Sequence, residues 1–226
     1  QRGPPSGIGE EEWGMRRFVL GLAVVAVLAA CGHGARFVVS RPVGENRVIT
    51  VSGAASNVYF IEADRGYVMV AAGMAAGVEE VRTLFSAAGI EPAEVTLIVV
   101  THVHPDHVAG LFAAKELSGA KVLCHRSAAQ RLGTGRSEPI VGHGPMGAFI
   151  AAVCPKNFKA VAPDILVDDD FSLEEYGMEG AVVHGPGHTS GSLMIVLSSG
   201  EVLVGDQVRG VNAELSLGQF CEDRSL

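Results

Sequence analysis

Side chains that can bind a metal ion are concentrated in one short segment of the chain, Thr101-His102-Val103-His104-Pro105-Asp106-His107. The segment directly follows an apolar run, residues 94–100, that we expect to be a buried strand. Alternate side chains of an extended segment point to the same side, so the imidazoles of His102 and His104 can reach a single ion. The spacing therefore predicts a metal-binding loop at the end of a strand.

Asp106 and His107 add two more potential ligands directly after this pair. Pro105 keeps the extended stretch from turning helical too early, and we expect a helix over 106–117 to begin after it. The second pair is therefore displaced from the first and can serve a neighbouring ion. Imidazole and carboxylate ligands in this combination suit zinc best, with iron and manganese as alternatives.

Two segments nearer the C-terminus carry further ligands. His188 stands in a turn whose glycines let the backbone bend sharply, His184-Gly-Pro-Gly-His188-Thr-Ser-Gly-Ser192. Asp206 ends an apolar run that we expect to be a strand, Val202-Leu-Val-Gly-Asp206. A carboxylate at a strand end beside several histidines is well placed to bridge two cations.

Two groups of strands, each accompanied by helices, must position these residues. Strands are predicted over 47–52, 57–62, 67–71, 94–100, 121–124, 180–183, 192–197 and 201–204, the first three of them antiparallel. Helices are predicted over 75–88, 106–117 and 145–153. The pattern indicates an α/β fold built as a layered sandwich rather than as a doubly wound sheet.

Taken in this order, the three motifs resemble the metallo-β-lactamase superfamily, and the resemblance covers roughly Ile49 to the C-terminus. It implies a four-layer αββα sandwich with a metal site at one sheet edge. It also implies that one ion is held by three histidines, His102, His104 and His188. Asp106 and His107 would hold a second ion, with Asp206 bridging the two and Asp106 also orienting the attacking water as the catalytic residue.

The resemblance implies a zinc-dependent hydrolase that attacks an ester, thioester, lactone or amide bond of a small molecule with a metal-activated water. Two Zn²⁺ ions are expected in the complete protein, with iron or manganese as alternatives. Two other functions remain open, a non-catalytic metal-binding lipoprotein of the same fold and an iron-dependent oxidoreductase.

The chain departs from the family pattern in two places. The family typically supplies one more histidine in a Pro-Gly-His stretch well after the bridging acid, whereas no histidine follows Asp206 here. We therefore expect the fold to be incomplete at its C-terminus, with Cys221 as a less favoured substitute ligand. The second departure is Ala71, because many relatives carry an acid at this position that supports the metal-binding histidines.

The first residues of the chain are typical of an export signal. Two arginines precede an apolar run, residues 18–30, that is too short for a membrane span and ends in Leu-Ala-Ala-Cys31. This end resembles the lipobox of bacterial lipoproteins, which implies a lipid anchor on Cys31 and a place in the bacterial cell envelope. The alternative is a buried hydrophobic helix of the fold. The expected organisation is a non-native or upstream leader (1–14), a signal peptide (15–30), a tether (31–46) and the catalytic domain (47–226).

Composition excludes some classes of function. The 226 residues are 48% hydrophobic with a formal net charge of −8, and no dense Lys/Arg cluster could neutralise nucleic-acid phosphates. Four cysteines without a CxxC pair exclude a dense disulfide framework. Of the remaining histidines, His184 is expected to line or brace its turn, and surface or loop roles are favoured for His125 and His143.

Overall fold

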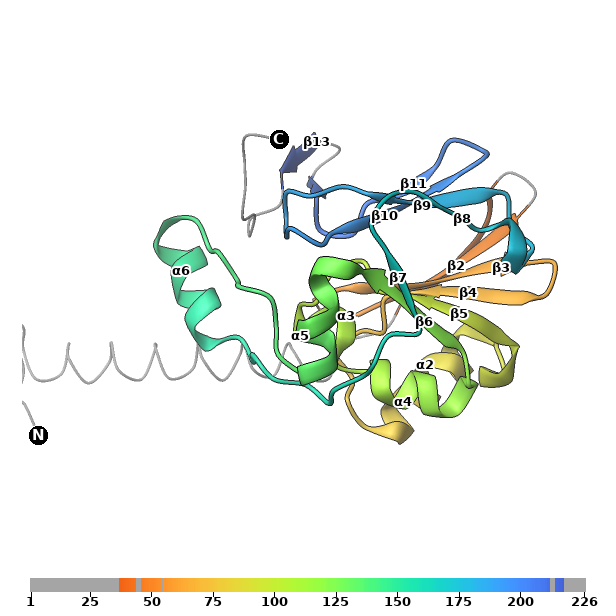
Figure 1. Ribbon diagram of the computed structural model, residues 1–226, viewed down its shortest axis with the longest axis horizontal. Coiled ribbons are helices and arrows are strands. Elements are labelled where there is room, and N and C mark those ends of the chain that lie inside the picture. Colours follow the sequence, from red (N-terminus) through yellow and green to blue (C-terminus); the bar gives the residue numbers. More distant parts are fainter. Residues whose placement is uncertain (1–36, 44–45, 54, 212–213, 218–226) are drawn as a thin grey trace, which may run out of the picture.

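The computed structural model describes residues 37–43, 46–53, 55–211 and 214–217 of the chain (Figure 1). The expected leader (1–14) and signal peptide (15–30) lie outside these residues, as do Cys31 and Cys221. In the part of the chain that is described, no helix has the length and apolarity needed to span a membrane.

The larger of the two main sheets has seven strands in sequence order, β1 to β7. They are β1 (Phe37–Val43), β2 (Asn46–Ser52), β3 (Asn57–Ala63), β4 (Gly66–Val70), β5 (Val95–Val99), β6 (Lys121–His125) and β7 (Ile165–Val167). Strands β1 to β4 pair antiparallel, which confirms the pairing expected for the strands at 47–52, 57–62 and 67–71, and β4 to β7 pair parallel. Because parallel strands need crossover connections, helices enter the fold only after β4.

The smaller sheet is antiparallel, with the strand order β11-β10-β9-β8. Its strands are β8 (Phe171–Ser172), β9 (Gly180–His184), β10 (Leu193–Leu197) and β11 (Val202–Leu203). A separate hairpin pairs β12 (Val208–Val211) with β13 (Glu214–Leu217).

The helices gather mainly on one side of the larger sheet, opposite the smaller sheet (Figure 1). They are α2 (Val78–Ala88), α3 (Pro105–Val108), α4 (Leu111–Ser118), α5 (Ala129–Thr134) and α6 (Gly144–Val153), with short 3₁₀ turns at Pro92–Glu94, Arg126–Ala128 and Glu174–Tyr176. Helix α6 projects away from the sandwich (Figure 1). Three of the four expected layers are therefore present, because among the described residues no α-helix covers the outer face of the smaller sheet.

Alternating side chains of β5 explain why the layers stack in this way. Leu97 and Val99 belong to an apolar cluster between the two sheets, where they meet residues such as Ile195 of β10. Ile98 and Val100 belong to a second cluster beneath the helices. A strand buried on both faces reads as a continuous apolar run, as predicted for residues 94–100. Its end, and therefore the metal-binding loop that follows, is fixed by both cores.

The structure corrects two boundaries. The tether expected over 31–46 contains strand β1, whose Phe37–Val43 pairs along its whole length with Asn46–Ser52 of β2. The helix expected over 106–117 is broken into α3 and α4. The Gly110 amide donates to the carbonyl of Gly73, and the Asp106 carbonyl accepts from the Ser56 hydroxyl instead. The bond that would have continued the helix is therefore replaced by two contacts with distant segments.

Candidate metal centre

His102 and His104 lie in the extended segment between β5 and α3, and both are almost completely buried, at 1% and 5% exposure. Between them the Val103 side chain points into the core beneath the helices. The alternation of an extended chain thus sends one side chain into the core and the two imidazoles to the opposite side, as the spacing predicted.

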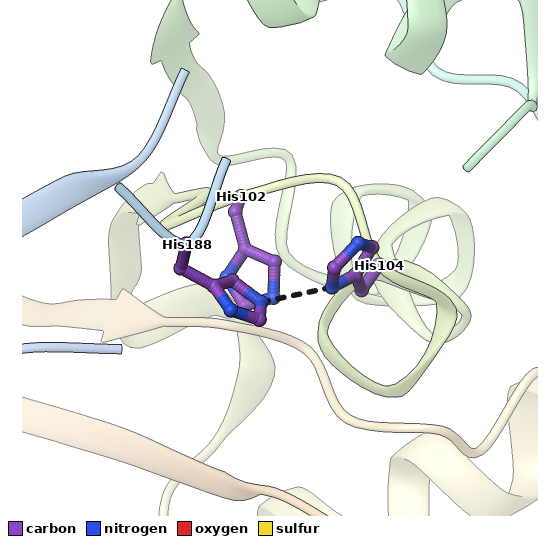
Figure 2. Close-up of side chains that lie close together, drawn as sticks. All are labelled: His102, His104 and His188. Atoms are coloured by element: carbon purple, nitrogen blue, oxygen red, sulfur yellow. Dashed lines mark hydrogen bonds between the residues drawn. The ribbon is translucent and has the colours of Figure 1, made fainter. Parts of the chain in front are cut away.

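His188 reaches the same place from the turn between β9 and β10 of the smaller sheet. Its Nε2 lies 3.0 Å from Nδ1 of His104, and Figure 2 shows the three rings of His102, His104 and His188 converging. One ligand atom from each ring lies within 4.8 Å of the other two. The His188 amide also donates to Oε1 of Gln207 at 3.0 Å, which ties this turn to the residue after Asp206.

The hydrogen bonds around the rings select the nitrogens that face the centre. His104 Nε2 lies 3.3 Å from the carbonyl oxygen of Pro139, which can only accept, so Nε2 carries the proton and Nδ1 presents a lone pair. His102 Nδ1 lies 3.2 Å from the Thr101 hydroxyl. Its Nε2 is buried and has no hydrogen-bond partner among the described residues. A buried nitrogen without a partner is costly, and a cation bound there would satisfy it.

His107 and Asp206 form a second group with His102, in which the three ligand atoms again lie within 4.8 Å of one another. His107 Nε2 lies 3.1 Å from Oδ1 of Asp206. Asp206 also approaches the first group, with Oδ2 3.9 Å from Nε2 of His188. Asp206 is therefore the carboxylate between the two groups, which is the place that the sequence motif assigned to it.

Asp106 lies beside these groups rather than within either of them, among the residues that the structure describes. Its Oδ2 is 3.6 Å from Nε2 of His107, and its side chain is 23% exposed. The structure thus brings five of the six predicted ligands into two compact groups and leaves Asp106 at their margin. Its role as a ligand stays a prediction.

The electrostatics of the centre favour cation binding at neutral pH. Burial and the neighbouring histidines lower the pKa of His102 far below its usual value, so its ring stays neutral. Burial would raise the pKa of Asp206, but the hydrogen bond and the charges of the histidines outweigh it and hold the pKa at about 2. Burial also lowers the pKa of His104, whereas at His107 burial is outweighed by the charge of Asp106 and by the hydrogen bond and charge of Asp206, which raise its pKa. The neutral rings of His102 and His104 and the ionised Asp206 have the protonation states that metal ligands need, and a cation binding at His107 would displace its proton.

Gly205 allows Asp206 to sit this close to the metal-binding loop. Its backbone has φ +57°, in the left-handed region, and a Cβ there would lie 3.3 Å from the Cβ of Thr101. Helix α3 is held in turn by the Ala72 amide, which donates to the His107 carbonyl at 2.7 Å. The second group is therefore positioned by backbone contacts as well as by sequence spacing.

Two histidines outside the centre form a stacked pair, His125 at the end of β6 and His184 at the end of β9. Their ring centroids are 3.9 Å apart with an interplanar angle of 13°. His184 donates from Nε2 to the Ser190 carbonyl at 3.0 Å, which confirms that it braces the turn. The surface role favoured for His125 is wrong, because this side chain is only 8% exposed. The stack joins the two sheets, a long-range contact that no local pattern encodes.

Comparison with known proteins agrees with this geometry. The sequence model of the metallo-beta-lactamase superfamily matches residues 51–208, which is more than half of the chain. The chain belongs to this superfamily. The match includes the complete metal-binding loop as well as His188 and Asp206, so every predicted ligand lies inside the region that carries the superfamily's pattern.

Curated relatives in the superfamily match a smaller part of the chain. A hydroxyacylglutathione hydrolase of Pseudomonas paraeruginosa is 33% identical over 96 residues, which cover 42% of this chain and 26% of that protein. A protein with the same description from Pseudomonas aeruginosa is 32% identical over 96 residues. The chain thus spans about a quarter of the length of the curated relatives that it matches.

Solved structures of superfamily members share the fold. A metallo-β-lactamase of Cronobacter sakazakii with a HARLDQ motif superposes with a TM-score of 0.58 and 20% identity, covering 79% of this chain and 60% of that one. BJP-1, a subclass B3 metallo-β-lactamase of Bradyrhizobium japonicum, superposes with a TM-score of 0.56 and 20% identity, covering 84% and 62%. At these identities the likeness establishes the fold alone.

Proposed function

We propose that the protein is a metal-dependent hydrolase of small carbonyl compounds. The observation that carries this proposal is the convergence of His102, His104 and His188 within 4.8 Å, with the His107–Asp206 pair directly beside them. Such a buried cluster, in which burial keeps the rings of His102 and His104 neutral, is costly unless it binds a cation. Zn²⁺ is the cation that this ligand set suits best, with iron and manganese as alternatives.

Different residues of the chain would bind the two ions and orient the attacking water. His102, His104 and His188 would hold one ion, and His107 and Asp206 would hold a second. When bound, a divalent cation polarises the substrate carbonyl and lowers the pKa of water. Asp106 lies at the margin of both groups with a partly exposed carboxylate, so its Oδ2 can accept a hydrogen bond from the attacking water and orient it.

Four substrate classes fit this chemistry: esters, thioesters, lactones and amides. We place thioesters first because the curated relatives that match this chain are hydroxyacylglutathione hydrolases. The superposed β-lactamases support the fold and leave the substrate open.

The decisive experiment combines metal analysis with a hydrolysis screen. We expect the purified chain to bind Zn²⁺ and to hydrolyse at least one thioester, ester, lactone or β-lactam, with turnover lost in His102→Ala. His143→Ala is the matched control, because His143 is an exposed histidine at the start of α6. A chain that binds zinc without turnover would favour the non-catalytic metal-binding protein. A chain active only with Fe²⁺ and a redox substrate would favour the oxidoreductase.

We also propose that the protein is exported to the bacterial cell envelope and anchored by a lipid on Cys31. The support is the sequence alone, a basic start and a short apolar run ending in Leu-Ala-Ala-Cys31. In a bacterial host, metabolic labelling with a fatty acid should label the full-length chain and leave Cys31→Ser unlabelled. Equal labelling of both chains, or of neither, would contradict the anchor.

A further inference from the structure

A buried acid, Glu138, holds the backbone of the metal-binding loop. The amide of Glu138 donates to the Val103 carbonyl at 2.9 Å, and the Val103 amide donates back to Oε2 of Glu138 at 2.7 Å. Glu138 is only 5% exposed. Two hydrogen bonds between the same two residues restrict both position and rotation, so this reciprocal pair fixes the backbone of Val103.

Val103 is the residue between His102 and His104. Its side chain is buried in the core beneath the helices, and its backbone is fixed by Glu138. The two imidazoles on either side therefore share one rigid backbone unit. The distance between their ligand nitrogens follows from the orientation of this unit.

The residue after Glu138 fixes one of the rings as well. The Pro139 carbonyl accepts a hydrogen bond from His104 Nε2 at 3.3 Å, which leaves Nδ1 facing His188. Hydrogen bonds of this kind to a ligand's second nitrogen determine both its tautomer and its orientation. Two adjacent residues, Glu138 and Pro139, thus control the backbone and the ring of the same loop.

Glu138 also approaches the segment that carries the third histidine. A Cβ on Gly191 would lie 3.3 Å from Oε1 of Glu138. Gly191 belongs to the turn that begins with His188. One carboxylate therefore lies between the metal-binding loop and this turn, with one oxygen accepting from the loop and the other beside the turn.

We propose that Glu138 is a positioning residue of the metal centre, which holds His102 and His104 at ligand spacing without contacting the cation itself. This inference rests on the proposed metal-dependent function. Glu138 lies outside the motifs that mark the ligands and falls in the segment 133–165, where the sequence pattern predicts little regular structure.

The chain contains a matched control for the same bonding pattern. The Asp164 amide donates to the Val122 carbonyl at 2.8 Å, and the Val122 amide donates back to Oδ2 of Asp164 at 2.8 Å. This pair lies at the start of β6, whereas the metal-binding loop follows the end of β5. Removing either carboxylate deletes the same kind of backbone contact, and Asp164→Ala also removes an ion pair with Lys115 at 2.7 Å, but only Glu138 touches the metal-binding loop.

The experiment measures the Zn²⁺ affinity of the full chain by competition with a chelating dye, together with the visible absorption of the Co²⁺ form and the melting temperature of the chelated protein. We expect Glu138→Ala to lower Zn²⁺ affinity by about 10–100-fold and to change the Co²⁺ spectrum. Glu138→Gln should recover part of the affinity, because its amide oxygen can still accept from Val103. Asp164→Ala should lower the melting temperature and leave Zn²⁺ affinity unchanged.

The possible outcomes test the positioning role of Glu138 separately from the proposed metal-dependent function. If Glu138→Ala binds Zn²⁺ and Co²⁺ like the parent while melting earlier, Glu138 is a structural acid only and the proposal is overturned. If Glu138→Ala does not fold, the Gln variant decides: a lower affinity with a changed Co²⁺ spectrum supports the positioning role, and parent-like values of both overturn it. If the parent itself binds no metal, the proposed function fails and the positioning role fails with it.

Discussion

Nε2 of His188 lies 3.0 Å from Nδ1 of His104, although 84 positions separate the two residues in the sequence. His104 follows β5 of the larger sheet, and His188 follows β9 of the smaller sheet. The contact exists only when both sheets are correctly packed, so the centre depends on the complete sandwich rather than on any single motif.

Replacing His188 should therefore abolish tight metal binding without preventing folding. His188→Ala removes one of three ligands from the first group but leaves the apolar clusters of the two sheets intact. We expect the Zn²⁺ bound per chain, measured by elemental analysis after dialysis, to fall in His188→Ala and to stay at the parent level in His143→Ala. Parent-like zinc content in His188→Ala would remove it from the ligand set.

Gly110 is predicted to be intolerant of even one added methyl group. A Cβ at this position would lie 2.3 Å from the Ala72 carbonyl oxygen and 2.7 Å from that of Ala75, and neither backbone atom can move aside easily. Gly110→Ala should lower the free energy of unfolding by roughly 1–3 kcal/mol in urea denaturation. Gly133→Ala is the control, because a Cβ there meets nothing within 4 Å. It should raise stability by about 0.5–1 kcal/mol, as expected for a helical glycine.

Ala71 is predicted to be a position where an acid improves the centre. Its φ of +60° lies in the left-handed region, which aspartate and asparagine tolerate better than alanine does. The next amide, that of Ala72, is bonded to the His107 carbonyl. Ala71→Asp should raise Zn²⁺ affinity by roughly 10-fold or more, measured by dye competition.

The uncharged variant Ala71→Asn separates the relief of backbone strain from the effect of the added charge. Both variants should relieve the backbone strain, but position 71 is 2% exposed, so in the metal-free protein the aspartate should give the lower melting temperature because burying an unpaired charge is costly. Only the aspartate should change metal affinity. Equal affinity in the two variants would mean that the charge at this position contributes nothing to the site.

The stacked pair of histidines predicts a loss of stability in mild acid. Burial and the neighbouring His184 ring lower the pKa of His125 below its usual value of about 6.5. His125 Nδ1 accepts the Ser127 amide, and its ring lies near Arg126 and near Asp168, whose carbonyl accepts from Nε2. Protonating Nδ1 would break the bond from the Ser127 amide and place a charge against His184, although the Ser127 hydroxyl at 2.8 Å could then accept from Nδ1.

The direction in which stability changes with pH follows from the lowered pKa of His125. The unfolded chain binds the proton more tightly, so the contribution of His125 is complete above about pH 6.5 and is lost as the pH falls towards its folded-state pKa. Unfolding titrations between pH 7.5 and 5 should show a smaller decrease for His125→Asn than for the parent. Asparagine keeps an acceptor for the Ser127 amide but does not titrate. Identical pH profiles for the two proteins would contradict the prediction.

Apolar runs were sufficient to predict most of the strands, and spacing predicted that His102 and His104 share a side, whereas the grouping of His188 and Asp206 with them followed from the resemblance to the metallo-β-lactamase superfamily. Strand β5 was recognisable because a strand buried on both faces is apolar throughout, and His102 and His104 because alternate residues share a face. Short strands carried no such signal. β7 and β8 have only three and two residues, and their pairing with β6 and β9 stabilises them more than their own composition does.

Contacts between segments that are distant in the sequence could not be predicted from local patterns. The break between α3 and α4 depends on Ser56 and Gly73, which take over hydrogen bonds that a continuous helix would have made. Glu138 was missed for the same reason, because the contacts that distinguish it join distant positions, such as Val103, 35 positions away. Sequence motifs thus point to the candidate ligands, whereas the residues that hold them in place are visible only in three dimensions.

Because His104 and His188 lie on different sheets, their placement has a consequence for the stability of the protein in the cell. An ion held by His104 and His188 would close a loop of 84 positions, in the manner of a reversible cross-link. Closing such a loop lowers the conformational entropy of the unfolded chain. This stabilises the folded state by on the order of 4 kcal/mol, an effect comparable to that of a disulfide. Zinc supply would then control how much of the protein survives proteolysis, and the amount of enzyme would follow the availability of its metal.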